Sequence, residues 1–184
     1  MAQFKLAIIV GSNRKASINL RLARALAKLG TPSFVPHFVR IDDLPLFNQD
    51  LEANAWPEAA TRLKSEIAEA QAILVVTPEH NRSIPAALKN AIDWAARPSG
   101  KGVWRDKTVA IIGASPGTIG TACAQQHLRV ILGNLGAQVM GGEMFITYKE
   151  GLVDDADEVT NDATREFLQK FVDRFAGFVG KLAA

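Results

Sequence analysis

Apolar runs with strand character alternate with helical patterns five times along this chain of 184 residues. The expected strands are residues 4–10, 33–41, 72–77, 107–113 and 137–146. The expected helices are residues 18–29, 57–70, 85–95, 120–133 and 160–182. Alternation of this kind is typical of a parallel sheet that carries helices on both faces.

The residues of the first two strands limit the possible strand orders of the sheet. Residues 4–10 are apolar almost throughout, as expected for a strand buried on both faces, and Pro36 indicates an edge position for the second strand. Crossovers between parallel strands are right-handed, so few strand orders remain. We predict an α/β, flavodoxin-like, doubly wound sheet of five parallel strands in the order 2-1-3-4-5, with its ligand site at the carboxyl ends of the strands.

Composition excludes several classes of protein. The length favours one domain, residues 1–184, and the net charge of +2 is too small to indicate a nucleic-acid partner. Cys123 is the only cysteine, which excludes an internal disulfide and fits the cytoplasm. We see no signal peptide and no apolar run long enough to insert into a membrane. The histidines, at positions 37, 80 and 127, lack metal-ligand spacing, so we expect no metal.

The loop after the first strand, residues 11–17, is small, polar and basic, and a helix begins directly after it. It offers a glycine, neutral donors and two cations: Gly11, Ser12, Asn13, Arg14, Lys15 and Ser17. Free N–H groups at a helix N-terminus bind anions. Both the Walker A motif and the dinucleotide glycine motif are absent, so a terminal monophosphate suits this loop better than a pyrophosphate. The same residues also fit an ordinary turn with Ser17 as N-cap.

Two further loops fall at the same edge of the predicted sheet. Residues 78–85 begin and end with proline, which restricts the backbone, and such a loop can present backbone groups to the edge of a heterocycle. Residues 113–120 are rich in glycine, and their N–H groups would bind a carbonyl or a developing negative charge. Both loops also fit plain turn chemistry, with Asn81 and Ser83 as turn and cap residues and His80 exposed.

With these loops, the chain resembles the NAD(P)H-dependent FMN reductase family, in particular its quinone, chromate and ferric reductase branch. The matching segments follow the family order along the whole chain: Gly11–Asn19, Leu44–Leu51, Pro78–Pro85, Leu88–Trp94 and Gly113–Gly117. The resemblance implies a flavodoxin-like fold with bound FMN and with NADH or NADPH as cosubstrate. The flavin carries the chemistry in such enzymes, so we expect no catalytic side chain.

The resemblance also implies the residues that bind FMN. Around the phosphate it places Gly11, Ser12, Asn13, Arg14, Ser17, Ile18 and Asn19. Beside the isoalloxazine it places Pro78, Glu79, His80 and Asn81, and on the other side Ser115, Pro116 and Gly117. In this family the loop that corresponds to residues 44–51 approaches the flavin of a partner subunit, which implies a homodimer or homotetramer with Asn48, Gln49 and Asp50 at that contact. His80 stands where this branch usually has tyrosine.

We therefore expect a two-electron oxidoreductase. NADH or NADPH would reduce bound FMN, and quinones would reoxidise it, with ferric chelates, chromate or free flavin as further acceptors. We expect loop N–H groups and the helix after Gly117 to stabilise the anionic reduced ring. One alternative is a flavodoxin-type electron carrier, although carriers of this type usually have an acidic face and this chain is slightly basic. Another is a flavin-free regulatory or structural domain on the same fold.

Three expectations concern packing. Residues 42–56 form a loop that is long for a compact monomer, which favours a role between subunits. We expect Trp94 at an interface. Four phenylalanines in the last helix recur at nearly helical spacing and are expected in the core: Phe167, Phe171, Phe175 and Phe178.

Overall fold

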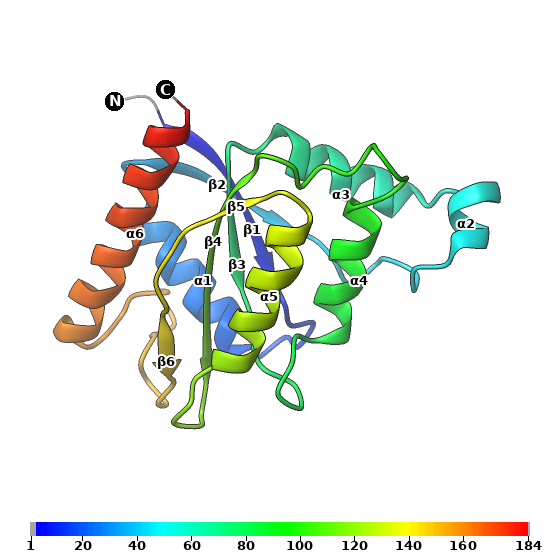
Figure 1. The fold of residues 1–184 in the computed structure, drawn as a ribbon. Coiled ribbons are helices and arrows are strands. Elements are labelled where there is room, and N and C mark those ends of the chain that lie inside the picture. Colours follow the sequence, from blue (N-terminus) through cyan, green and yellow to red (C-terminus); the bar gives the residue numbers. More distant parts are fainter. Residues whose placement is uncertain (1–2, 184) are drawn as a thin grey trace.

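A parallel sheet organises the computed structural model, which describes residues 3–183 (Figure 1). Its strands are β1 (Phe4–Val10), β2 (Phe34–Val39), β3 (Ala72–Val76), β4 (Thr108–Ser115), β5 (Gln138–Val139) and β6 (Phe145–Thr147). Their order is β2-β1-β3-β4-β5, and β6 also pairs with β4. The predicted flavodoxin-like order is confirmed.

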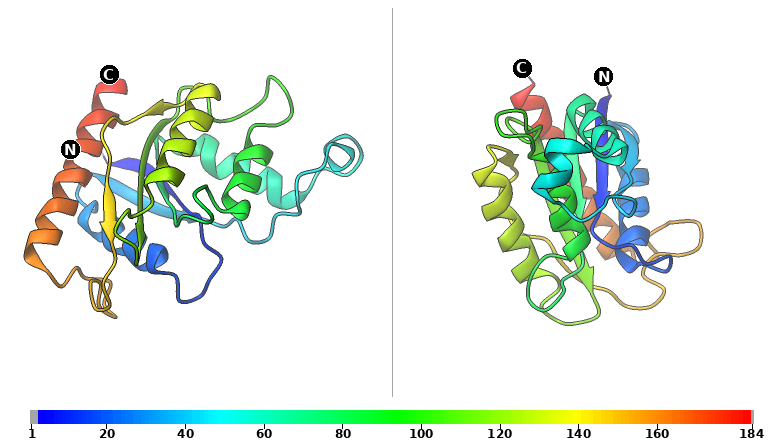
Figure 2. Two further views of the ribbon diagram at one scale, coloured as in Figure 1. Left: turned by 60° about the horizontal axis from the view of Figure 1, so that its bottom comes forward. Right: turned by 90° about the vertical axis from the view of Figure 1, so that its right-hand side faces the viewer.

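Helices cover both faces of the sheet. They are α1 (Ile18–Leu29), α2 (Gln49–Asn54), α3 (Glu58–Glu69), α4 (Ala86–Ala95), α5 (Ala122–Asn134) and α6 (Asp162–Leu182). Helices α1 and α6 pack on one face, and α3, α4 and α5 pack on the other (Figures 1 and 2). Successive residues of β1 point to opposite faces, so Ile8 joins the first core and Ile9 the second. Both are almost fully buried, as the apolar run predicts.

The fifth predicted strand differs from the structure. Residues 137–146 form two short strands, because the Gly141–Gly142 segment interrupts them and Gly142 has a φ of +82°. Strand β5 pairs with the start of β4, and β6 pairs with its end. Strand β4 also continues to Ser115, beyond the predicted end at residue 113, so the exposed part of the following loop begins only at Pro116.

Two packing predictions were wrong in part or in full. Trp94 is completely buried inside its own chain and does not lie at an interface. In α6, Phe171 and Phe175 are buried and Phe178 is partly buried, but Phe167 is 47% exposed. A step of four residues turns a helix by about 40° beyond a full turn, so Phe167 lies about 80° around the axis from Phe175.

Residues 42–57, which we call the arm, leave the body of the molecule and contain α2 (Figures 1 and 2). The sequence predicted only a loop here, and α2 is a short helix with Asn48 as N-cap. Within residues 3–183, no helix combines the length and the hydropathy that a membrane span requires.

Candidate cofactor site

The ends of β1, β3 and β4 approach one another closely at the carboxyl edge of the sheet. A Cβ atom on Gly113 would overlap the carbonyl oxygen of Thr77 and the hydroxyl of Thr121, and one on Gly11 would lie 2.9 Å from Oγ1 of Thr77. Glycine at both positions therefore permits this packing. It brings the loops after the three strands together at one edge, the lower edge in Figure 1.

The loop of residues 11–17 keeps its polar groups largely free. Asn13, Arg14 and Lys15 are exposed, and no side chain of these three bonds another group in residues 3–183. The N–H of Arg14 approaches Oγ of Ser12 at 3.4 Å, which is a weak contact. Ser17 is buried and caps α1, since its Oγ accepts the N–H of Leu20 at 3.2 Å. Free donors, two cations and a helix N-terminus form a suitable site for a phosphate.

Asn19 and Ile18 lie deeper in the first turn of α1. The amide of Asn19 pairs with the backbone of Ala114, donating to its carbonyl at 2.9 Å and accepting its N–H at 2.9 Å. Asn19 is 1% exposed, so it joins α1 to β4 directly behind the loop. A contact with phosphate would need its second N–H and stays a prediction. Ile18 is half-buried and packs on the core.

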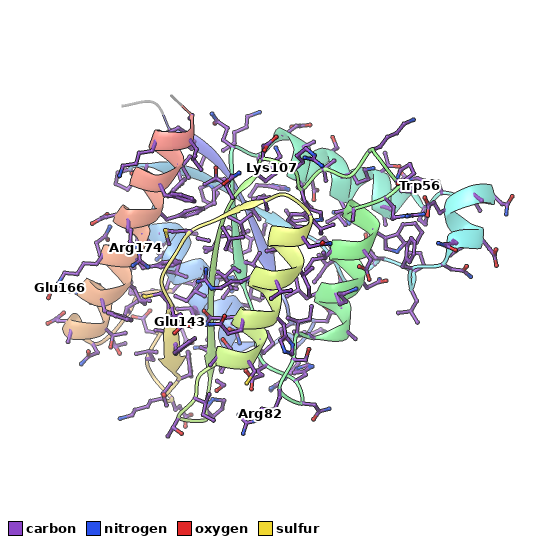
Figure 3. The ribbon with its side chains drawn as sticks, viewed as in Figure 1. Trp56, Arg82, Lys107, Glu143, Glu166 and Arg174 are labelled. Carbon is purple, nitrogen blue, oxygen red and sulfur yellow. The ribbon has the colours of Figure 1, made fainter. Side chains whose placement is uncertain are left out.

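The loop of residues 78–85 is a tight hairpin. His80 and Ser83 exchange two backbone hydrogen bonds of 3.0 Å, and the two residues between them have left-handed backbones, with φ of +49° at Asn81 and +63° at Arg82. This is the geometry of a two-residue hairpin turn. Pro78 and Glu79 are half-buried, whereas His80, Asn81 and Arg82 are exposed. Arg82 extends from the carboxyl edge, opposite the edge that carries Lys107 (Figure 3).

Two side-chain contacts fasten this hairpin to α5. Oε2 of Glu79 accepts the N–H of Ala124 in the first turn of α5 at 3.1 Å, and the Glu79 side chain is only 10% exposed. Ser83 Oγ lies 2.9 Å from Nδ1 of His127 in the same helix. Thr121, at the start of α5, provides no side-chain cap, so Glu79 takes that role from outside the helix. The positive end of α5 therefore faces a carboxylate, which reduces the field expected to stabilise an anionic ring.

The third loop closes on itself beside the same helix terminus. The Ser115 hydroxyl lies 2.6 Å from the carbonyl of Gly120 and 3.3 Å from that of Gly117. Pro116 and Gly117 are exposed, and a Cβ on Gly117 would have only Ser115 Oγ nearby, at 3.7 Å. The backbone at Gly117 is thus open to the approach of a flat group. The structure brings this loop and the hairpin of residues 78–85 together on the N-terminus of α5.

The residues that we predict to contact a partner subunit lie outside the three loops. Asn48, Gln49 and Asp50 are exposed on the arm, away from the three loops of their own chain (Figure 1). The arm is held by a residue that sequence reasoning missed: Asn90 of α4 accepts the N–H of Phe47 at 2.8 Å and donates to the carbonyl of Pro45 at 2.9 Å. In the sequence, only the resemblance of residues 88–94 to the family indicated that Asn90 has a role.

Trp94 and Arg97 complete the attachment of the arm. The indole N–H of Trp94 donates to the same Pro45 carbonyl at 2.8 Å, and its ring meets Phe47 edge-on at 5.0 Å. Arg97 pairs with Glu52 at 2.9 Å. The arm is therefore a fixed projection, held by hydrogen bonds and aromatic packing.

Comparison with known proteins decides the family. The family model described as NADPH-dependent FMN reductase matches residues 4–151. The chain belongs to this family. It is 47% identical over 176 residues to a 2-hydroxy-1,4-benzoquinone reductase from a Burkholderia species, covering 95% of this chain and 96% of the relative. It is 46% identical over 177 residues to a quinone reductase from Pseudomonas putida, covering 96% and 95%.

A solved structure extends the comparison to the fold. The flavoenzyme NAD(P)H:(acceptor) oxidoreductase FerB from Paracoccus denitrificans has 43% sequence identity and a TM-score of 0.93, covering 97% of this chain and 98% of its own. Family membership identifies FMN as the cofactor and NAD(P)H as the electron donor. The residues at the edge of the sheet fit this cofactor, because free donors and cations gather at one helix N-terminus and an open glycine backbone lies in another loop at the same edge.

Proposed function

We propose that this protein transfers two electrons from NADH or NADPH, through bound FMN, to quinones. The observation that carries the proposal is the meeting of three loops of different character at one edge of the sheet. One loop has free phosphate donors, and the other two are fastened to the N-terminus of α5. Relatives named quinone reductases, aligned over nearly the whole chain, support quinones as acceptors. Ferric chelates, chromate and free flavin are proposed as further acceptors.

The binding residues follow from the loops. The phosphate group would be held by Gly11, Ser12, Asn13, Arg14, Ser17, Ile18 and Asn19. The ring would lie against Pro78, Glu79, His80 and Asn81, with Ser115, Pro116 and Gly117 opposite. Bound FMN supplies the electron-transfer chemistry, so no side chain needs to act as a nucleophile.

The residues of the chain would then bind the FMN phosphate, orient the ring and adjust the electrostatics around it. Arg14 would offset the charge of the FMN phosphate, and the free N–H groups at the start of α1 would bind its oxygens. Pro78 and the hairpin behind it present a rigid backbone edge, because the hairpin is fastened to α5 at two points. The N–H of Gly117 is available to an oxygen of the ring. His80 lies exposed at the rim, where an acceptor would enter.

We also propose a homodimer or homotetramer in which the arm completes the site of a partner subunit. The arm is rigidly attached, yet Leu46 at its surface is 79% exposed, an apolar side chain without cover. Asn48, Gln49 and Asp50 would make the polar contacts. A monomeric mass in light scattering, with full activity at nanomolar enzyme, would contradict this assembly. We further propose one domain, a cytoplasmic location, and neither nucleic-acid binding nor membrane insertion.

The deciding experiment is steady-state kinetics of the purified yellow protein with NADH and NADPH across a panel of quinones, ferric chelates, chromate and free flavins. We expect heat denaturation to release FMN and not FAD, and quinones to be reduced fastest. A protein that binds FMN but oxidises neither nicotinamide would instead be an electron carrier. A colourless protein that FMN cannot reconstitute would be a flavin-free domain.

A further inference from the structure

A pocket lies beside the loop of residues 11–17, which we call the phosphate loop, on its β2 side and away from the other two loops. Because β2 pairs with β1 in parallel, with Val39 opposite Ile9, the chain that leaves β2 emerges beside residues 11–15. The two segments border an open pocket of about 340 Å³. Its polar rim is formed by Ser12, Asn13, Arg14, Lys15, Arg40 and Asp42.

The charges of this pocket favour an anion. Two cations that are not assigned to FMN, Lys15 and Arg40, line it beside Arg14 and one carboxylate, Asp42. Asp42 is paired with Arg40 at 2.7 Å, and this hydrogen bond lowers the pKa of the Asp42 carboxyl, which keeps it charged. Asp43 nearby lies 2.8 Å from Arg62 and 3.8 Å from Nε of Arg40. The Arg40 side chain is 63% exposed and has further guanidinium N–H groups for a ligand, as Lys15 has its ammonium.

The wall of the pocket is apolar and partly aromatic. Val10, Val39 and Ile41 are buried in it, whereas Phe38 is 39% exposed. An accessible aromatic ring stacks on nucleic-acid bases, and adjacent arginine and lysine bind phosphate. An exposed ring beside cations is thus suited to a phosphorylated nucleoside.

The place of the pocket beyond the second strand favours one nucleoside. In dinucleotide-binding sheets of the Rossmann type, an acidic side chain at this place binds the ribose hydroxyls of NAD, and an arginine there accommodates the 2′-phosphate of NADP. This chain lacks the glycine motif of those sheets and shares with them only the place of the charged residues beyond the second strand. Here Arg40 follows β2 directly, Lys15 lines the same pocket, and Asp42 is paired with Arg40. We propose that this pocket binds the 2′-phosphorylated adenosine of NADPH and makes the enzyme favour NADPH over NADH.

This inference rests on the proposed function, since it assigns a place to one end of the electron donor. It requires no displacement of FMN. The residues proposed for the ring lie at the ends of β3 and β4, and the pocket lies on the β2 side of the phosphate loop. The loop of residues 11–17 would border both phosphate sites, with Arg14 assigned to FMN and Lys15 and Arg40 assigned to the nucleoside.

Binding tests the pocket without turnover. Isothermal titration of the FMN-loaded protein with adenosine 2′,5′-bisphosphate and with 5′-AMP should show the bisphosphate bound about tenfold tighter or more, as expected for charge-assisted contacts. Arg40→Ala and Lys15→Ala should each remove most of that difference. Arg105→Ala, an exposed arginine just before β4 at the opposite edge of the sheet, should retain it. Equal affinity of the two nucleotides for wild type would overturn the proposal.

Kinetics supplies the second readout. The ratio of KM for NADPH to KM for NADH should rise about tenfold in Arg40→Ala and in Lys15→Ala and stay unchanged in Arg105→Ala. An unchanged ratio in both pocket variants would overturn the proposal. If wild type oxidised neither nucleotide but still selected the bisphosphate, the proposed function would fail while the pocket assignment would be supported.

Discussion

The phosphate loop and the hairpin of residues 78–85 border the same edge of the sheet but are built in opposite ways. In the phosphate loop, the side chains of residues 13–15 are exposed and bond no other group in the described part of the chain. In the hairpin, Glu79 and Ser83 both bond α5, and the backbone is closed by two hydrogen bonds. One loop leaves its polar side chains free, and the other uses them to hold its own shape.

The difference follows from what each loop would bind. A phosphate carries charge in every direction, so free donors and cations can adjust to it. A flat ring is recognised by its edge, and a backbone that presents hydrogen-bonding groups to an edge must already be in place. We therefore expect substitutions in the phosphate loop to change the affinity for FMN. Substitutions in the hairpin should change the free energy of unfolding and the midpoint potential of bound FMN.

The largest effect is expected from Arg14→Ala. Loss of a charge-assisted hydrogen bond to phosphate, about 1.5–3 kcal/mol, should weaken FMN binding roughly tenfold to a hundredfold. Turnover of the fully loaded enzyme should change far less, because Arg14 is proposed to contact the phosphate and not the reacting ring. Fluorescence titration of apoprotein with FMN measures the affinity, and Arg24→Ala, an exposed arginine of α1, is the matched control. Unchanged affinity in Arg14→Ala would remove this residue from the site.

The next effect is on stability. Glu79→Ala removes the cap of α5, which should lower the free energy of unfolding by about 1 kcal/mol. Denaturant unfolding of the FMN-saturated protein should show a lower midpoint with an unchanged slope. Glu150→Ala, an exposed carboxylate outside the three loops, is the control. Equal stability of Glu79→Ala and wild type would mean that this contact does not hold the hairpin.

A substitution that removes only the charge of Glu79 separates its role in holding the hairpin from its electrostatic effect on the flavin. Glu79→Gln retains an oxygen that accepts the N–H of Ala124 but removes a negative charge beside the proposed ring. The reduced flavin is the more negative form, so the midpoint potential of bound FMN should rise, by about 10–30 mV. Spectroelectrochemistry measures the shift, with Glu143→Gln as control. A potential that stays constant or falls would contradict the electrostatic role.

The smallest effect is expected at the rim. His80 is exposed where an acceptor would enter, and tyrosine at this position would present a larger aromatic ring. His80→Tyr should therefore change acceptor reduction more than reduction by NADH or NADPH, without loss of FMN. Stopped-flow measurement of the two half-reactions separates these effects. Identical acceptor half-reactions in wild type and His80→Tyr would leave exposed His80 without a role in catalysis.

Much of the fold could be read from the sequence because its signals are local. Apolar runs and helical periodicity placed the main strands and helices, and glycine and proline placed the loops between them. The errors lie where such signals are weakest. The Gly141–Gly142 segment splits one predicted strand into β5 and β6, and the polar spacing around residues 49–54 did not reveal α2. The cover over Trp94 comes from the arm, a segment distant in sequence.

The sequence by itself determined the strand order, the edge at which the loops meet and the family. These follow from patterns within single segments and from the constraints on connecting them. Only the tertiary structure decided how side chains are used: Asn19 bonds Ala114, Glu79 caps α5, and Asn90 holds the arm. Each of these contacts joins residues far apart in the chain. A buried polar group takes whichever partner the packing of helices and strands places within hydrogen-bonding distance, and no local pattern encodes that choice.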